Sequence, residues 1–169
     1  MVQTGQTLII SLRFDRWAFT MHSYDGDILA WSQEQARLIR AGRFDLLDRV
    51  HVAEEIEDVG KSEQRELASR MVVLLAHLLK WAYQPDRRGA SWEKTIKAQR
   101  KDIAYHLDET PSLRPKLDEA RWLDVVWSKA VAAAVSETGL DAFPETCPWT
   151  MQDQVLHADW YPDPVNTEG

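Results

Sequence analysis

The chain has 169 residues, of which 44% are hydrophobic and 28% charged, as in a single globular domain. A net charge of -7 opposes general binding to nucleic acid, which depends on Lys and Arg. No apolar run approaches ~18 residues, so no membrane span is expected, and the single cysteine, Cys147, fits a reducing, cytoplasmic location.

The helical pattern begins only after a stretch that differs from the rest of the chain. We expect residues 1–20 to be a leader, and residues 21–169 to form one helical domain. Apolar side chains at helical spacing predict a first helix over Tyr24–Arg40, and Gly42 follows it in the position of a C-cap.

Two further periodic segments flank Gly60. Phe44–Val59 and Ser62–Gln84 both carry apolar stripes, and the middle of the second is apolar almost all round, which predicts a central buried helix. The stripes stay in phase across Gly60, so one long kinked helix is an alternative. A hairpin at Gly60-Lys61, with Ser62 capping the next helix, is favoured because one helix of that length would be ~60 Å long.

Pro85 ends this segment, and Ser91 is predicted to cap a fourth helix over Trp92–Glu109. Thr110-Pro111 opens a fifth, which runs to about Glu137 before a Gly139 C-cap. The last segment contains four prolines, one short helix after Thr150 and several aromatic side chains that we expect to anchor it. The predicted fold is an all-α bundle of about five main helices with a Pro-punctuated C-terminal segment.

An acidic run, Glu54-Glu55-Ile56-Glu57-Asp58, is the first candidate site. Glu54 and Glu57 share positions with an apolar stripe, where a carboxylate needs a partner or a proton. Three interpretations stay open: a hydrated face, an ion pair with an arginine of another helix, or part of a metal or acid–base site.

His77 and Lys80 are the second candidates, because they lie on the most apolar helix. A buried histidine satisfied by neighbouring groups is one interpretation, and a ligand or general base is the other. In neither the hairpin nor the single helix do Glu54 and Glu57 come close to His77, so no metal is assigned to one chain.

Basic residues supply the third candidate site. Residues 84–101 have six bases and two acids, a net charge of +4, whereas residues 45–66 have eight acids and three bases, a net charge of -5. We expect the two segments to pair with each other, within one chain or between subunits. Anion binding at Arg87, Arg88 and the helix start at Ser91 is the alternative, and Trp92 could stack on a base.

Several strings together resemble the bacterial family known as domain of unknown function 29. They include Arg43-Phe44-Asp45-Leu46-Leu47-Asp48, Glu54 to Glu63 and His77-Leu78-Leu79-Lys80-Trp81, and the match runs from about Tyr24 to Pro162. His51 and Ala82 depart from the pattern. The resemblance implies a small, mostly helical bacterial protein, carries over no catalytic residue, and draws attention to these motif positions: Glu54, Glu55, Asp58, His77, Lys80, Trp81, Trp92 and Arg100.

No phosphate-binding loop, dinucleotide-binding loop, serine-hydrolase elbow or zinc-protease motif occurs in the sequence. We therefore expect a non-catalytic interaction or regulatory module without a cofactor, whose partner is a protein, either a second copy or another subunit. The alternative is a hydrolase or metal-dependent enzyme that uses the Glu54 and Glu57 carboxylates with His77 or Lys80.

Overall fold

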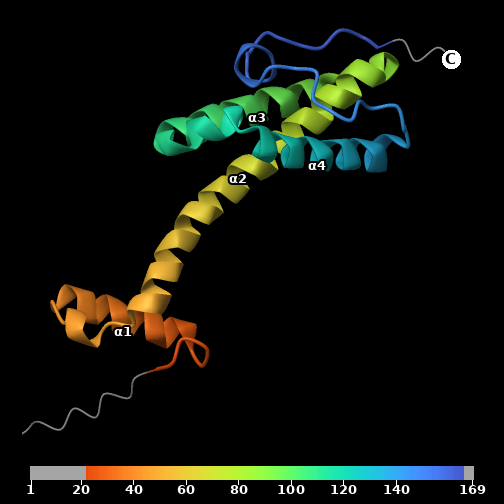
Figure 1. Ribbon diagram of the computed structural model, residues 1–169. Helices are drawn as coiled ribbons and strands as arrows, with labels where there is room; N and C mark the ends of the chain where they lie inside the picture. The colour runs from red at the N-terminus through yellow and green to blue at the C-terminus, as the bar shows by residue number, and fades with distance from the viewer. Residues whose placement is uncertain (1–21, 166–169) are drawn as a thin grey trace, which may run out of the picture. The chain divides into compact units, whose positions relative to one another are not determined.

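The computed structural model describes residues 22–165, and every regular element in this range is helical, as predicted for an all-α fold (Figure 1). The expected leader over residues 1–20 lies outside the described residues. Between residues 22 and 165, no helix combines the length and the apolar character needed to cross a membrane. In chain order the elements are α1 (Ile28–Arg40), η1 (Phe44–Leu46), α2 (Arg49–Tyr83), η2 (Pro85–Arg87), α3 (Ala90–Glu109), η3 (Pro111–Asp118), α4 (Ala120–Thr138) and η4 (Met151–Val155).

The predicted hairpin at Gly60 is wrong, because α2 is one continuous helix of 35 residues. Gly60 is not among the glycines with positive φ in the described range, which are Gly42 and Gly139. Ser62 consequently lies inside α2 and caps nothing. An interior glycine costs only about 1 kcal/mol relative to alanine, a penalty that the in-phase helical segments on both sides outweigh.

The predicted glycine stops elsewhere in the chain are confirmed. Gly42 follows the end of α1 with φ 69°, and Gly139 ends α4 with φ 72°. At these values a side chain would be strained, so glycine marks the point where the helix stops. The predicted cap at Ser91 is wrong: Gly89 is the N-cap of α3, and Ser91 lies in its first turn.

The described residues divide into two compact units, the first ending at Glu55 and the second beginning at Ile56. In the first unit the side chain of Asp27 caps α1 by accepting a hydrogen bond from the Ala30 amide at 3.0 Å. Trp31 and Leu38 are buried on the inner face of α1. Local capping and one apolar stripe are thus enough to place this helix.

Asp48 is the polar centre of the first unit. It accepts hydrogen bonds from Trp31 Nε1 at 3.2 Å and from His51 Nδ1 at 2.6 Å. Its backbone amide donates to Gln35 Oε1 at 2.9 Å, and Tyr24 stacks on the His51 ring at 4.3 Å. The bond from His51 lowers the pKa of Asp48, and the bond to Asp48 raises the pKa of His51 above its ordinary 6.5.

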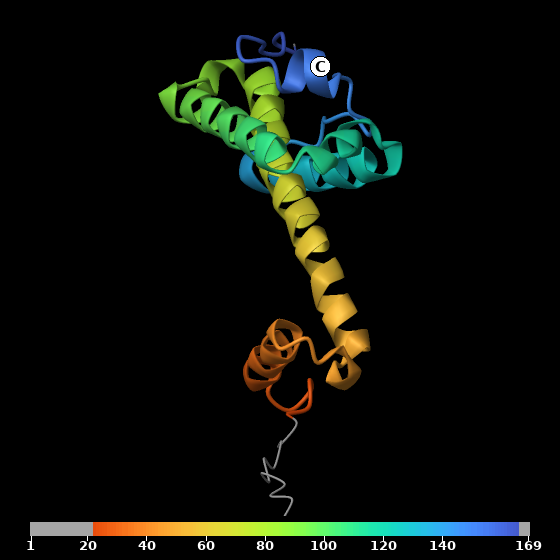
Figure 2. The same ribbon diagram turned by 90° about the vertical axis from the view of Figure 1, so that its left-hand side faces the viewer.

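The second unit is built around the latter half of α2, as predicted for the central helix. Leu67, Met71 and Leu74 are fully buried, and α3 and α4 supply Ile96, Ile103, Trp127 and Ala130 to the same core. Figures 1 and 2 show α3, α4 and the C-terminal segment gathered around this half of α2. The predicted fifth helix begins as η3, which contains Pro115, and continues as α4 after an extended Glu119.

The C-terminal segment is anchored by aromatic side chains, as expected. Trp149 contacts Trp127 of α4 with ring centroids 5.7 Å apart and Trp160 with centroids 5.6 Å apart. Tyr161 packs against Trp81 of α2 at 4.7 Å, and Phe143 packs against Tyr83 at 4.9 Å. These rings hold a segment with little regular structure against the helical core.

Candidate functional site

The first turns of α2 within the second unit present apolar side chains to solvent. Ile56 and Val59 are 67% and 63% exposed, whereas Leu67 and Leu74 are fully buried. At 100° per residue, Ile56 and Gly60 continue the helix face formed by Leu67 and Leu74. The core face of α2 therefore extends beyond the bundle, and in both ribbon views no other helix of the second unit lies beside it (Figures 1 and 2).

The acidic run on α2 is largely hydrated. Glu54, Glu57 and Asp58 are exposed. Asp58 pairs with Lys61 one turn along at 2.7 Å, and Glu55 accepts a hydrogen bond from the Tyr24 hydroxyl at 2.5 Å. The Lys61 ammonium lowers the pKa of Asp58. The carboxylates are thus acceptors on an open helix surface rather than acids held in a dry pocket.

Lys80 is a buried residue at the centre of a polar cluster that joins three helices. Only 4% of the residue is exposed, and its ammonium pairs with the carboxylate of Glu137 on α4. The same nitrogen lies 3.3 Å from Nε2 of His77 and 5.2 Å from the centre of the Trp92 ring on α3. A carboxylate, an imidazole and an aromatic face together compensate for the water that Lys80 loses.

The hydrogen bonds of His77 assign its tautomer. Nδ1 lies 2.8 Å from the Val73 carbonyl oxygen, which can only accept, so Nδ1 carries the proton. Nε2 is then free to accept from the Lys80 ammonium. Burial lowers the pKa of His77, the carbonyl opposes this, and the Lys80 charge lowers it further. His77 is therefore a neutral histidine that supports a buried lysine.

The basic candidates do not converge on one anion site. Arg87 is exposed, whereas Arg88 donates from Nε to the Trp81 carbonyl at 2.8 Å and lies over the Trp81 ring. Ser91 is exposed in the first turn of α3, and Trp92 belongs to the Lys80 cluster. Of these residues, Arg88 holds the backbone and the ring of Trp81 near the end of α2.

Arg100 fastens the C-terminal segment to α3. Its Nε, Nη1 and Nη2 donate to the carbonyl oxygens of Val155, Ala158 and Trp160 at 2.9, 3.0 and 2.6 Å. The guanidinium also lies 5.2 Å from the centre of the Tyr161 ring. Burial lowers its pKa, which the charge of Asp159 and the neighbouring Tyr161 counteract. The residue is a multivalent clamp on otherwise irregular backbone.

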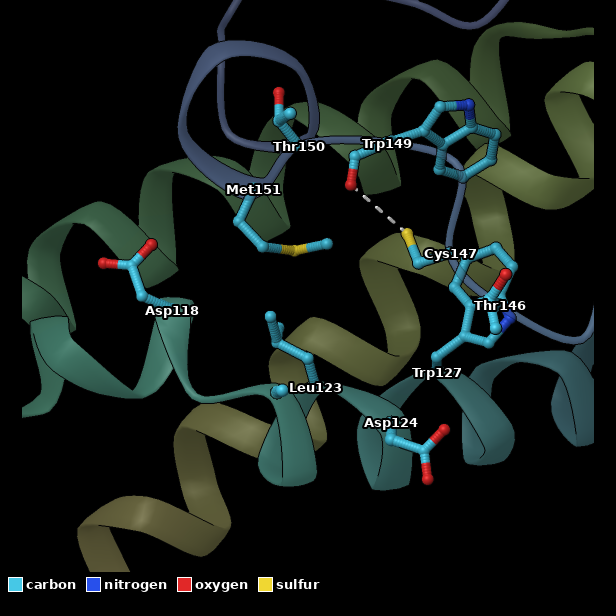
Figure 3. Close-up of a pocket in the computed structure, with 10 residues that line it drawn as sticks. Asp118, Leu123, Asp124, Trp127, Thr146, Cys147, Trp149, Thr150 and Met151 are labelled. Atoms are coloured by element: carbon cyan, nitrogen blue, oxygen red, sulfur yellow. Dashed lines mark hydrogen bonds between the residues drawn. The ribbon is translucent and has the colours of Figure 1, made fainter.

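A cavity of about 460 Å³ lies between the start of α4 and the C-terminal segment (Figure 3). Leu123, Trp127, Cys147 and Met151 line its apolar part, and Figure 3 shows the Asp118 carboxylate directed away from Cys147. Burial raises the pKa of the Cys147 thiol, so little of the nucleophilic thiolate exists at neutral pH. None of the catalytic candidates from the sequence lines this cavity.

The acidic and imidazole candidates lie far apart. Glu57 and His77 are 20 residues apart on one helix, which corresponds to ~30 Å at 1.5 Å per residue. In the described part of the chain, no group of three or more His, Cys, Asp or Glu side chains could hold a metal ion. A joint acid–base or metal site of these residues in one chain therefore has no geometry to support it.

A family model for a domain of unknown function, DUF29, matches residues 23–161, which include nearly all the described residues of both units. The chain belongs to the DUF29 family. Neither a curated protein nor a solved structure matches it.

Several DUF29 motif positions noted in the sequence meet in the structure. His77, Lys80 and Trp92 form the Lys80 cluster, and Trp81 contacts both Arg88 and Tyr161. Most of these positions therefore hold α2, α3 and the C-terminal segment together. Glu54 and Asp58 instead lie on the exposed part of α2.

The sequence-based reasoning missed Glu137 and the exposure of Ile56 and Val59. Glu137 is 57 residues from Lys80, and its place at the end of an apolar helix carries no local signal of a partner. The exposure of Ile56 and Val59 had a signal in the sequence. The apolar stripe of α2 continues in phase through Gly60, as it does in a helix that extends beyond the bundle it belongs to.

Proposed function

We propose that this DUF29 protein is a non-catalytic interaction module, and that the first part of α2 in the second unit binds another protein chain. The observation that carries the proposal is the exposed pair Ile56 and Val59, on a helix whose inner face is the core of the unit. Amphipathic helices bind partners through anchors at this spacing, because apolar area removed from water stabilises the complex.

Gly60 supports the same surface. A methyl group built on Gly60 would meet no atom within 4 Å, so nothing in the described part of the chain requires glycine there. Glycine in an exposed helix interior lowers stability by about 1 kcal/mol relative to alanine. A partner backbone that approaches closely at this position would account for the glycine, because glycine has no side chain to block the approach.

The charged candidates fit an interaction role as well. Exposed Glu54 and Glu57 flank the apolar positions with negative charge, which favours a partner with a basic surface. The Lys80 cluster and the Arg100 clamp stabilise the bundle from which this helix projects.

A photo-cross-linking amino acid at Val59 of the full chain, expressed in its native host, tests the proposal. We expect protein adducts from Val59, fewer adducts when Ile56→Ser is added, and none from the same probe at exposed Lys129 on α4. Equal labelling from both probe positions, or no adduct from Val59, would refute an interaction surface on α2.

A further inference from the structure

Two exposed surfaces of opposite charge occur in the chain. The acidic segment consists of residues 54–59 of α2, where Glu54, Glu57 and Asp58 accompany exposed Ile56 and Val59. The basic face of α3 consists of Lys94, Lys97, Lys101 and Tyr105, whose spacings of three, four and four residues place them on one side of the helix. Tyr105 is 67% exposed, so this face also offers apolar area.

In the described residues of the second unit, no ion pair joins the acidic residues of α2 to the basic face of α3. In the described residues, Asp58 pairs with Lys61 of its own helix, and Lys97 pairs with Glu93 of its own helix. No ion pair or hydrogen bond within that range engages Glu54, Glu57, Lys94 or Lys101. Of the two pairings expected for the oppositely charged segments, the one between subunits therefore remains.

We infer that the partner is a second copy of this chain, with the acidic segment of one copy docked on the basic face of the other. This inference rests on the proposed function of α2. Glu54 and Glu57 are three residues apart, as are Lys94 and Lys97, so the charges repeat at ~4.5 Å along both helices. Tyr105 supplies an aromatic surface for Ile56 or Val59.

A two-fold arrangement lets both copies use both surfaces. In such a dimer, α2 of each subunit contacts α3 of its partner, and the two contacts are equivalent. The two acidic and two basic clusters of the dimer, each made of like charges that repel one another, are then paired with opposite charge. A nucleic acid on the basic face is the weaker alternative, because the chain has a net charge of -7.

Charge exchange with the full chain tests this pairing by analytical ultracentrifugation. We expect a reversible dimer whose dissociation constant rises about tenfold or more in Glu54→Lys/Glu57→Lys, and likewise in Lys94→Glu/Lys101→Glu, because each places like charges opposite one another. Mixing the two variants restores complementary surfaces and returns the dissociation constant to within about threefold of the wild-type value. The control Asp141→Lys/Glu145→Lys makes the same charge change as Glu54→Lys/Glu57→Lys at other exposed positions and leaves the dissociation constant unchanged.

A monomer at every concentration overturns the inference, as does a dimer that these charge variants leave intact or a mixture that fails to associate. All four substituted positions are exposed, so the variants are expected to fold. Far-UV circular dichroism of each variant verifies this. The Val59 cross-link separates this inference from the proposed function. An adduct with another protein, from a chain that remains monomeric, supports an interaction module and refutes the second copy.

Discussion

Replacing Gly60 by alanine tests directly whether α2 is continuous. In the structure Gly60 lies inside the helix, and a Cβ atom built there meets nothing within 4 Å. Alanine therefore adds helix propensity without a clash, worth about 1 kcal/mol. Part of the gain comes from the unfolded chain, which loses conformational freedom when glycine is removed.

Urea unfolding followed by far-UV circular dichroism measures this effect. With a urea m-value of about 1–3 kcal/mol/M, a gain of ~1 kcal/mol raises the midpoint by roughly 0.3–1 M. The mean residue ellipticity at 222 nm should not become less negative, because no helix is lost. Low protein concentration keeps self-association, in which Gly60 could take part, from contributing.

Gly139→Ala is the matched control. This glycine ends α4 with φ 72°, a conformation that costs a residue with a side chain roughly 1–2 kcal/mol. We expect the two substitutions to change stability in opposite directions. A Gly60→Ala variant that is destabilised like Gly139→Ala would mean that Gly60 is in a turn, and the exposed apolar part of α2 would lose its basis.

Three further predictions concern the polar contacts. Arg100→Lys should lower the free energy of unfolding by about 2–3 kcal/mol, because a single ammonium nitrogen cannot reach the three carbonyls that three different guanidinium nitrogens bind. Hydrogen exchange of residues 155–160 should accelerate, and unchanged exchange contradicts the clamp. Glu137→Ala should lower the free energy of unfolding by about 2–3 kcal/mol, because it leaves the buried Lys80 ammonium without a counter-charge. Lys80→Met, which removes the charge itself, should lower it by less than ~1 kcal/mol. Thermal unfolding that shows the reverse order refutes this account. The raised pKa of His51 and the lowered pKa of Asp48 make their pair most stabilising between about pH 4 and 6.5: the contribution declines as His51 deprotonates at higher pH and as Asp48 protonates at lower pH. An NMR titration should place the His51 pKa above 6.5 in the wild type and lower in Asp48→Asn, and a wild-type value below 6.5 would disprove the pairing.

Features that depend on neighbours along the chain could be predicted from the sequence alone. The 3.6-residue period identified the helices, and the apolar character of the middle of α2 marked it as central. Gly42 and Gly139 mark helix ends because only glycine adopts a positive φ without strain. The family resemblance also rested on local strings, and the family match confirms it.

Which polar side chains meet and which remain in water depends on how the helices pack. Helical phase places Glu54 and Glu57 beside an apolar stripe, but the bundle covers that stripe only from about Leu67 onwards, so the carboxylates stay hydrated. Lys80 pairs with Glu137, and Arg100 donates hydrogen bonds to carbonyls of the C-terminal segment, and the partners in both contacts are more than 50 residues apart in the chain. A pattern of nearest neighbours along one helix does not show where the packing of other helices stops. That limit determines which part of α2 remains exposed.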